Sequence, residues 1–372
     1  MEDRSYKQGY RRGLEKGRSQ GFQEGFKFGY HQVRSQVPES FDGTSIIIPT
    51  YNNFDFLKKC VQSIEQFTPE PHELIIVDNA STDGTREYLR QMAGRVKFVI
   101  NSENLGFAGA INQGLAIAGG STLLLLNNDT IVTKNWLSNL LTCVYSSEKV
   151  GLVGPVTNYI SGEQLIKTSY EDISQMHQFA SQYNVSDASR WVVTGNITGF
   201  CLLLRREVFT HLGYMDEGFE IGNCEDDDYA LRTQLAGYEL VIAKDTFIHH
   251  EGSVSMKALG DNFDQVYGKN LEFYSKKWED SHSLLQQIQT HASLRPHKMT
   301  ALYPSHVLVK APDSGLYWIE NGVRRALNAP EYEQHAAAVS RLELAQWPEG
   351  STISAQELTE KLQGLEGSLI RS

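Results

Sequence analysis

Residues 46–52 read IIIPTYN, and in this stretch an apolar run passes directly into a polar one. The same transition occurs at residues 74–84, LIIVDNASTDG, and at residues 123–129, LLLLNND. Short continuous apolar runs bounded by polar residues are typical of strands that are buried on both faces of a sheet. Each of these runs is therefore predicted to be a strand that ends in polar side chains.

Amphipathic segments lie between the apolar runs. Residues 57–67 and 110–118 carry apolar side chains at helical spacing, and residues 96–100 form a further apolar run. Strands that alternate with helices indicate an α/β fold, with a Rossmann-like, mostly parallel central sheet flanked by helices. Such sheets bind ligands at the carboxyl ends of their strands, so the polar clusters are expected to converge on one edge.

The pattern is weaker after residue 156. Residues 157–192 are polar and weakly periodic, which predicts a long loop or lid, whereas residues 192–204 and 238–243 have the composition of strands. Residues 261–295 are expected to be helical and to close the α/β domain. We place that domain at residues 44–295.

Residues 296–372 are predicted to form a small accessory module. The turn at residues 320–322, ENG, lies between two apolar runs and indicates a hairpin. Trp318 and Trp347 have two interpretations: they pack in the core of the module, or they stack on sugar rings. Core packing is the preferred interpretation.

Residues 1–37 form an arm in which glycine recurs at every fourth position from Gly9 to Gly29. A period of four is close to one helical turn, but each glycine costs an isolated helix ~1 kcal/mol relative to alanine. The arm carries eight Lys or Arg and four Asp or Glu, a net charge of +4. We interpret it as a self-association or docking arm, with a flexible solvated tail as the alternative. A linker is expected at residues 38–43.

Composition excludes several functional classes. A net charge of −11 argues against a nucleic-acid partner. The four cysteines show no CxxC spacing, which favours a reducing cytoplasm. The sequence contains no secretory signal pattern and no run of ~18 apolar residues. We therefore expect a cytoplasmic protein without a transmembrane segment, and peripheral attachment at the membrane or spore surface stays open.

The residues after the first strand narrow the enzyme class. No GxGxxG motif follows that strand, which excludes a dinucleotide-dependent dehydrogenase. Pro49-Thr50-Tyr51 contains neither glycine nor lysine, which counts against a nucleotidyltransferase. Each polar cluster alone also suits a turn or helix cap, because Asn, Asp and Ser are common there. Several clusters on one edge favour a binding site, and Asp129 suits a hard divalent cation that takes oxygen ligands.

A series of short motifs occurs in a fixed order over residues 44–275. They are IIIPTYN at 46–52, IVDNASTDGT at 76–85, NLGF at 104–107, LLNND at 125–129, GFC at 199–201, GYMDE at 213–217, EDDD at 225–228 with Arg232, GY at 237–238 and HH at 249–250. The ordered set resembles that of family 2 glycosyltransferases with the GT-A fold. The variants at 104–107 and 127–129 are most similar to relatives that serve bacterial cell-surface or spore-surface glycans, including rhamnosyltransferases.

The resemblance implies where the nucleotide-sugar donor binds. Asp78 would contact the nucleotide base, in a pocket lined by Thr50 and Tyr51. The remaining donor-binding residues implied by the resemblance are Pro49, Asn104, Gly106, Asn127, Asn128 and Asp129. The residues implied on the acceptor side are Gly199, Phe200 and Glu225.

The resemblance also implies a metal site. Asp129 matches the last acid of the Asp-X-Asp motif, which holds Mg²⁺ or Mn²⁺ against the donor diphosphate. His250 would be a further ligand, and His249 is the alternative. Asn127 replaces the first acid of the motif. The loss of that carboxylate makes metal binding depend more on the phosphates of the donor.

Residues 225–228, EDDD, supply the candidate catalytic base. Displacing a nucleoside diphosphate from an anomeric carbon requires that the leaving group be neutralised, which a divalent cation can do. It also requires a base for the proton of the attacking hydroxyl. Crowded carboxylates raise one another's pKa towards a useful range, although such acids also stabilise a helix N-terminus. The resemblance favours Asp226 as the base of an inverting displacement.

The sequence therefore predicts an inverting glycosyltransferase. It would move a hexose, N-acetylhexosamine or deoxyhexose from a UDP- or dTDP-type donor to a hydroxyl of a glycan, a lipid-linked acceptor or a protein. The alternative is a catalytically silent scaffold that binds sugar nucleotides and assembles through residues 1–37. The missing acid at Asn127 keeps this alternative open.

Overall fold

The computed structural model describes residues 40–252, 263–278, 281–282, 285–286, 307–311, 314–320, 323–339, 344, 347 and 349–359. The chain divides into two units, Met1–Phe41 and Asp42–Ser372. The glycine arm at residues 1–37 and the first part of the linker lie outside the described residues. The role assigned to the arm and the domain boundaries stay predictions.

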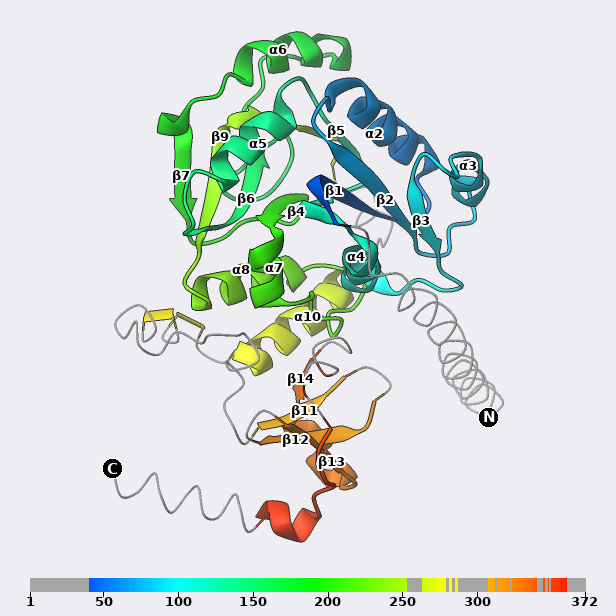
Figure 1. Ribbon diagram of the computed structural model, residues 1–372, viewed down its shortest axis with the longest axis vertical. Helices are drawn as coiled ribbons and strands as arrows, with labels where there is room; N and C mark the ends of the chain where they lie inside the picture. Colours follow the sequence, from blue (N-terminus) through cyan, green and yellow to red (C-terminus); the bar gives the residue numbers. More distant parts are fainter. Residues whose placement is uncertain are drawn as a thin grey trace. The chain divides into compact units, whose positions relative to one another are not determined.

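The second unit contains an eight-stranded sheet with the strand order β3-β2-β1-β4-β8-β6-β9-β7 (Figure 1). The strands are β1 (Phe41–Thr50), β2 (His72–Asp78), β3 (Lys97–Ile100), β4 (Gly120–Leu126), β6 (Val150–Val156), β7 (Trp191–Thr194), β8 (Cys201–Arg205) and β9 (Glu239–Phe247). A separate two-stranded sheet pairs β5 (Thr130–Ile131) with β10 (His249–His250).

The half of the large sheet that contains β1, β2, β3 and β4 is parallel. β1 pairs with β2 and β2 with β3 in parallel register. β4 runs in the same direction as β1, because its first residue, Gly120, donates to Ser45 Oγ (2.8 Å) while Asn128, just past its end, donates to Thr50 Oγ1 (2.8 Å). The carboxyl ends of β1, β2 and β4 therefore meet at one edge, as the sequence predicted.

The other half of the sheet is mixed. β8 is antiparallel to both β4 and β6, β7 is antiparallel to β9, and β6 is parallel to β9. The strand expected over residues 192–204 is in fact two strands, β7 and β8, which occupy different positions in the sheet. The α/β prediction is confirmed, and its parallel character is strongest around the strand ends discussed below.

Helices cover both faces of the sheet. They are α2 (Phe54–Phe67), α3 (Thr85–Gln91), α4 (Gly106–Ile117), α5 (Trp136–Val144), α6 (Met176–Tyr183), α7 (Arg206–Leu212), α8 (Glu225–Leu235) and α10 (Phe263–Trp278). Successive side chains of a strand point to opposite faces. Ile46 and Ile48 accordingly pack with α2 and α5, whereas Ile47 packs with α4, α7 and α8. The result is a three-layer α/β/α domain.

The prediction of a long loop over residues 157–192 is wrong in one part. It contains the helix α6 and two short 3-10 turns, Ile173–Gln175 and Ala188–Arg190. Met176 and Ala180 of α6 are buried against Phe247 of β9. This contact stabilises the helix, since its own sequence carries only a weak helical pattern.

The accessory segment forms a four-stranded sheet with the order β13-β12-β11-β14. Its strands are β11 (Val307–Lys310), β12 (Leu316–Glu320), β13 (Val323–Leu327) and β14 (Ala337–Ala338), and a 3-10 turn, η6, spans Pro330–His335. β12 and β13 are antiparallel and form the predicted hairpin. Trp318 and Trp347 are 1% and 2% exposed in two separate apolar clusters. The core-packing interpretation of both tryptophans is therefore correct.

Two further expectations can be checked. All four cysteines are free and buried, so they act as small core residues. Within the described ranges, no helix has both the length and the hydropathy that a membrane crossing requires.

Candidate active site

The carboxyl ends of β1 and β2 form the first part of the site. Thr50 lies opposite Asp78 in the parallel register. The ladder continues one residue beyond each strand, because Asn79 donates its N–H to Thr50 O (2.8 Å) and Asn101 donates its N–H to Asp78 O (2.8 Å). Thr50 and Asp78 are therefore buried side by side, whereas Tyr51, one residue further on, is 44% exposed.

The loops after these two strands are joined to each other. Asn52 donates its N–H to Ser81 Oγ (2.7 Å), and its Oδ1 accepts from the N–H of Thr82 (2.9 Å). Asn52 and Ala80 both adopt positive φ, at 55° and 67°. Such conformations are rare for residues other than glycine and need support from their surroundings. The cross-links between the two loops provide that support.

Asp83 has the capping role that the alternative interpretation assigned to these clusters. Its Oδ2 accepts from the N–H of Phe54 at the start of α2 (2.8 Å). Its Oδ1 accepts from the N–H of Thr85 at the start of α3 (3.3 Å) and from the hydroxyl of the same residue (2.7 Å). One side chain thus caps two helices, so the motif at residues 78–85 is partly structural.

Asp78 is fully buried at the end of β2. Its Oδ1 accepts from the N–H of Ser81 (3.0 Å), and its Oδ2 lies 3.5 Å from Nε of Arg86. Within the described part of the chain, Oδ2 has no hydrogen-bond donor. Arg86 was missed by the sequence analysis, although it lies in the first turn of the helix that follows the motif. A carboxylate oxygen that is paired only at this longer distance of 3.5 Å is suited to an N–H donor on a ligand.

The end of β4 is joined to β1 and β8. Asn128 donates to Thr50 Oγ1 over 2.8 Å, and Asn127 donates its N–H to Phe200 O over 2.9 Å. The carbonyl of Asn127 accepts from Thr130 Oγ1 (2.8 Å). Asn127 therefore supports the backbone of this turn, and its amide replaces the carboxylate that the motif usually carries.

Asp129 and His250 are brought into contact by the pairing of β5 with β10, in which His250 lies opposite Thr130. Asp129 Oδ1 is 3.1 Å from His250 Nε2, and both residues are buried. His250 Nδ1 lies 2.8 Å from Tyr159 O. A carbonyl only accepts, so Nδ1 of His250 carries a hydrogen, and Nε2 is the ring nitrogen that meets the carboxylate of Asp129.

The orientation of His250 is fixed from several sides. Asn158 accepts from the N–H of His250 (2.9 Å) and donates to its carbonyl (3.1 Å). The ring of Phe200 stacks on the imidazole, with centroids 5.4 Å apart. His249, in contrast, has its Nδ1 2.6 Å from the hydroxyl of Tyr170. Of the two histidines, His250 is the one whose ring nitrogen meets Asp129.

Asn104 and Gly106 lie at the start of α4. Asn104 Oδ1 accepts from the N–H of Gly106 (2.9 Å), and Gly106 O accepts from Asn79 Nδ2 (2.9 Å). Gly106 has a φ of +76°, and a Cβ at this position would meet Ile221 N at 3.3 Å. Phe107 also donates its N–H to Ile221 O (2.7 Å). These contacts connect the predicted donor side to the loop that precedes α8.

Asp226 is partly buried in the first turn of α8. Its Oδ2 accepts from the N–H of Gly199 (2.8 Å). Burial and the charge of Asp227 raise the pKa of Asp226 to about 6, although the N–H groups of Gly199 and Asp227 oppose this shift by stabilising the anion. A carboxylate with this pKa is ionised at neutral pH and basic enough to accept a proton.

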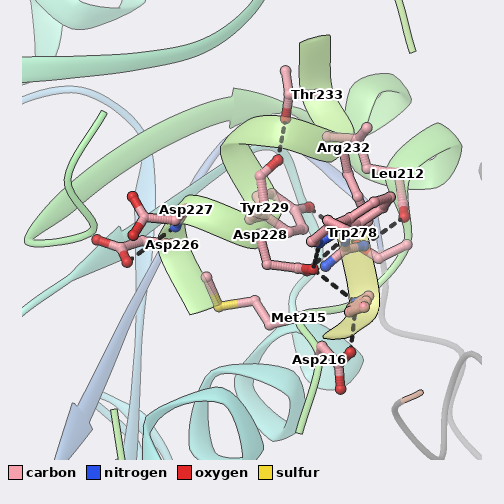
Figure 2. A network of polar contacts seen from close by, with 12 residues as sticks. Leu212, Met215, Asp216, Asp226, Asp227, Asp228, Tyr229, Arg232, Thr233 and Trp278 are labelled. Carbon is pink, nitrogen blue, oxygen red and sulfur yellow. Dashed lines mark hydrogen bonds and ion pairs between the residues drawn. The ribbon is translucent and has the colours of Figure 1, made fainter. Parts of the chain in front are cut away.

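The other three acids of the run have different surroundings. Glu225 is buried, and burial together with the charge of Asp226 raises its pKa well above the usual value. Asp227 accepts from Asn196 Nδ2 (2.7 Å). Asp228 points away from Asp226 and Asp227, towards Arg232 and Trp278 (Figure 2). The run is therefore not a uniform helix-stabilising cluster.

Gly199 and Phe200 connect the two chemical groups of the site. Gly199 binds the carboxylate of Asp226, while Phe200 accepts from the N–H of Asn127 and stacks on His250. The acidic turn of α8 and the pair Asp129–His250 are thus joined through two consecutive residues. The sequence analysis predicted all of these residues but not the contacts among them.

The fold and these strand ends define an α/β domain with a ligand site at the carboxyl edge of its sheet. The model of the family described as Glycosyl transferase family 2 matches residues 45–213. The chain therefore carries a family 2 glycosyltransferase domain with the GT-A fold, and it is a glycosyltransferase that uses a nucleotide-sugar donor. This confirms the resemblance drawn from the motifs.

Two curated relatives, GlyG and TuaG, agree with this assignment. The glycosyltransferase GlyG of Streptococcus pneumoniae is 26% identical over 249 residues, which cover 63% of this chain and 79% of GlyG. The putative teichuronic acid biosynthesis glycosyltransferase TuaG of Bacillus subtilis is 28% identical over 210 residues, covering 53% of this chain and 79% of TuaG. The mannosyltransferase PcManGT from Pyrobaculum calidifontis, solved with GDP-Man and Mn2+, is 18% identical, covers 74% of this chain and 85% of its own, and has a TM-score of 0.44.

Proposed function

We propose that this enzyme transfers a hexose, N-acetylhexosamine or deoxyhexose from a UDP- or dTDP-sugar to a hydroxyl with inversion at the anomeric carbon. Asp226 is the base that takes the proton of the attacking hydroxyl. Asp129 and His250 hold a divalent cation, Mg²⁺ or Mn²⁺. We further propose that the product is part of a bacterial surface glycan, since TuaG is named for teichuronic acid biosynthesis.

One observation supports this proposal most strongly. The carboxylate of Asp226 is held by the N–H of Gly199, and the next residue, Phe200, stacks on His250. The proposed base, Asp226, and the proposed metal ligand, His250, thereby contact two consecutive residues, Gly199 and Phe200. Direct displacement requires that the base and the leaving-group site keep a fixed geometry, and such a link maintains it.

The residues at Asp129 and His250 fit a divalent cation. Asp129 Oδ1 and His250 Nε2, both of atom types that ligate divalent cations, lie 3.1 Å apart, while Nδ1 faces a backbone carbonyl as in many metal-bound histidines. Within the described ranges, no group of three or more His, Cys, Asp or Glu residues could hold a metal. The donor diphosphate and water would complete the coordination. When bound, the cation neutralises the charge that develops on the leaving diphosphate.

The burial of Asp78 supports the proposed nucleotide specificity. Its Oδ2 has no hydrogen-bond donor among the described residues. Uracil and thymine present an N3–H donor, whereas cytosine presents an acceptor at the same position. A buried anionic acceptor therefore favours UDP or dTDP over CDP, because an acceptor placed against it would leave both groups unsatisfied.

Thermal stabilisation by nucleotides tests the donor site. UDP, dTDP, GDP and CDP would each be added with and without Mn²⁺ to the wild type and to Asp129→Ala. A ligand at ~100 times its dissociation constant adds about 2.7 kcal/mol. We expect metal-dependent stabilisation by UDP or dTDP that is lost in the variant. Stabilisation without any transfer or donor hydrolysis would instead support the silent scaffold.

A further inference from the structure

One face of α10 packs along the segment that leads into the proposed base. Asn270, Phe273 and Lys277 are spaced at i, i+3 and i+7, so they share a face of the helix. Their contacts lie on residues 216–228, which include the first turn of α8. This segment and α10 both lie beyond the matched residues 45–213.

Asn270 holds the loop before α8. It is 1% exposed, and its Nδ2 lies within 3.1 Å of three carbonyl oxygens, those of Glu220 (2.9 Å), Gly222 (3.0 Å) and Asn223 (3.1 Å). Its Oδ1 accepts from the N–H of Glu220 (2.9 Å). A single side chain thus binds the backbone of Glu220, Gly222 and Asn223.

That loop has an unusual backbone. Ile221, Asn223 and Cys224 adopt positive φ values of 61°, 84° and 69°. Non-glycine residues keep such a conformation only where neighbouring structure enforces it. Cys224, the N-cap of α8, makes no side-chain capping hydrogen bond. The start of α8 therefore depends on contacts from elsewhere in the fold.

Phe273 closes the space next to this loop. Its ring lies edge-on to that of Phe219, with centroids 4.9 Å apart. A Cβ at Gly218 would lie 2.4 Å from Cζ of Phe273, so the backbone at Gly218 approaches the ring closely. The loop and α10 are therefore in close contact at Gly218 and Phe219.

Lys277 lies between two buried carboxylates. Its Nζ is 2.5 Å from Asp216 Oδ2 and 2.7 Å from Asp228 Oδ1, and its side chain is 1% exposed. Trp278 donates Nε1–H to Asp228 Oδ1 (2.8 Å), and Arg232 donates to Asp228 Oδ2 (2.9 Å) (Figure 2). Two anions and two cations are buried together, so their formal charges cancel.

Asp228 and Asp226 lie in the same helical turn and are bound from different sides. Asp228 is held by α10 and Arg232, while Asp226 is held by Gly199. Figure 2 shows the two carboxylates pointing in different directions from α8. A change in the position of Asp228 would rotate the turn and move Asp226, because both side chains leave the same rigid backbone.

We propose that Lys277 is a positioning residue for catalysis, which acts with Asn270 and Trp278 to fix the turn that aims Asp226 at the acceptor hydroxyl. The inference rests on the proposed role of Asp226. The sequence carried no signal for Lys277, which lies 61 residues from Asp216. Its charge matters as well as its packing, because it neutralises Asp228 beside the catalytic turn.

The proposal has a consequence for the pH dependence of transfer. The charged groups near Asp226 are Glu225, Asp227, Asp228 and Arg232 on α8, Lys277 on α10, and Asp216. Tyr274 of α10 stays neutral, because burial raises its pKa to about 12. Without the positive charge of Lys277, the remaining charges of Asp216, Asp228 and Arg232 sum to −1. A negative charge nearby disfavours ionisation of Asp226, so the acidic limb of the pH–rate profile moves to higher pH.

The experiment compares Lys277→Met, the double variant Asp216→Asn/Lys277→Met, and Lys269→Met as a matched control on the exposed surface of α10. Lys269 pairs with Glu220 where both side chains are half exposed, so its loss costs little. For Lys277→Met we expect kcat to fall on the order of 10- to 100-fold with little change in donor KM. Stabilisation by UDP with Mn²⁺ is expected to persist.

The double variant separates charge from positioning. It restores a net charge of zero, so the acidic limb returns towards that of the wild type while kcat stays low. If Lys277→Met does not fold, Trp278→Phe removes one hydrogen bond to Asp228 and keeps the ring. A folded Lys277→Met enzyme with wild-type kcat and an unmoved acidic limb would overturn the proposal. Asp226→Asn, assayed alongside, reports independently on the proposed base.

Discussion

The backbone N–H of Gly199 donates to Oδ2 of Asp226 over 2.8 Å, and a Cβ placed on Gly199 would lie 3.0 Å from Cβ of Asp226. The absence of a side chain at Gly199 is thus what allows the proposed base to lie against the turn that precedes β8. The same hydrogen bond stabilises the anion and limits how far burial can raise the pKa of Asp226. The position of Asp226 and its pKa therefore both depend on the hydrogen bond from Gly199.

Replacing Gly199 by alanine is expected to impair transfer. The added Cβ displaces Asp226, and a small displacement of a catalytic group lowers the rate on the order of 10- to 100-fold. Nucleotide binding should persist, because Gly199 has no part in the base pocket at Asp78. Gly195→Ala is the matched control, since a Cβ there meets no atom within 4 Å. Equal activity of both variants would contradict the account.

Asp226→Asn is expected to stabilise the fold at neutral pH. The pKa of Asp226 rises from 3.8 to about 6 on folding, so the folded state binds the extra proton more tightly. Stability is therefore lost as pH rises from about 4 to about 6, and asparagine removes this loss. Thermal unfolding at pH 7.5 should show a gain of at most about 3 kcal/mol that disappears below pH 4. No difference at pH 7.5 would contradict the raised pKa.

The two adjacent histidines are expected to differ. His250→Gln should abolish the Mn²⁺-dependent part of nucleotide stabilisation, because His250 Nε2 is the ring nitrogen that faces Asp129. His249→Gln should retain it, since His249 is held by Tyr170. Thermal shifts with UDP, measured with and without Mn²⁺, distinguish the variants. Loss of the metal effect in His249→Gln alone would assign the site to the other histidine.

Asp78→Asn is expected to weaken binding of UDP or dTDP by about 10- to 100-fold, the range for a hydrogen bond to a charged partner. The amide can also turn its N–H₂ towards the ligand, so the preference over CDP should shrink. Binding of the three nucleotides can be compared by titration calorimetry. Unchanged affinities for all of them would place the base elsewhere.

The sequence predicted the strands that carry the candidate site better than it predicted the rest of the sheet. Continuous apolar runs identified β1, β2 and β4, and the strand ends carry Thr50, Asp78 and Asp129 as expected. Strand direction was harder to infer, because an antiparallel strand buried on both faces, such as β8, has the same composition as a parallel one. Likewise, α6 depends on tertiary contacts with Phe247 rather than on its own pattern.

The contacts that hold the site together could not be predicted. Lys277 and Asp228 form an ion pair but lie about 50 residues apart in the sequence. No local sequence pattern around Lys277 indicates this contact. The positive φ of Ile221 and Cys224 contradicts their residue preferences and occurs in a loop whose neighbouring carbonyls at Gly222 and Asn223 are bound by Asn270. Such features arise from packing between distant segments, whereas sequence patterns report local periodicity and the types of residue at strand ends.

The rate of sugar transfer by Asp226→Asn, compared with Asp227→Asn, tests the central claim most directly. The release of nucleoside diphosphate from UDP- and dTDP-sugars would be followed with a panel of hydroxyl acceptors. We predict that Asp226→Asn loses about 100- to 10,000-fold in rate while nucleotide binding persists. Asp227→Asn should stay active, with its acidic limb moved to lower pH, because the charge of Asp227 raises the pKa of Asp226. Near-normal transfer by Asp226→Asn would show that another group accepts the proton.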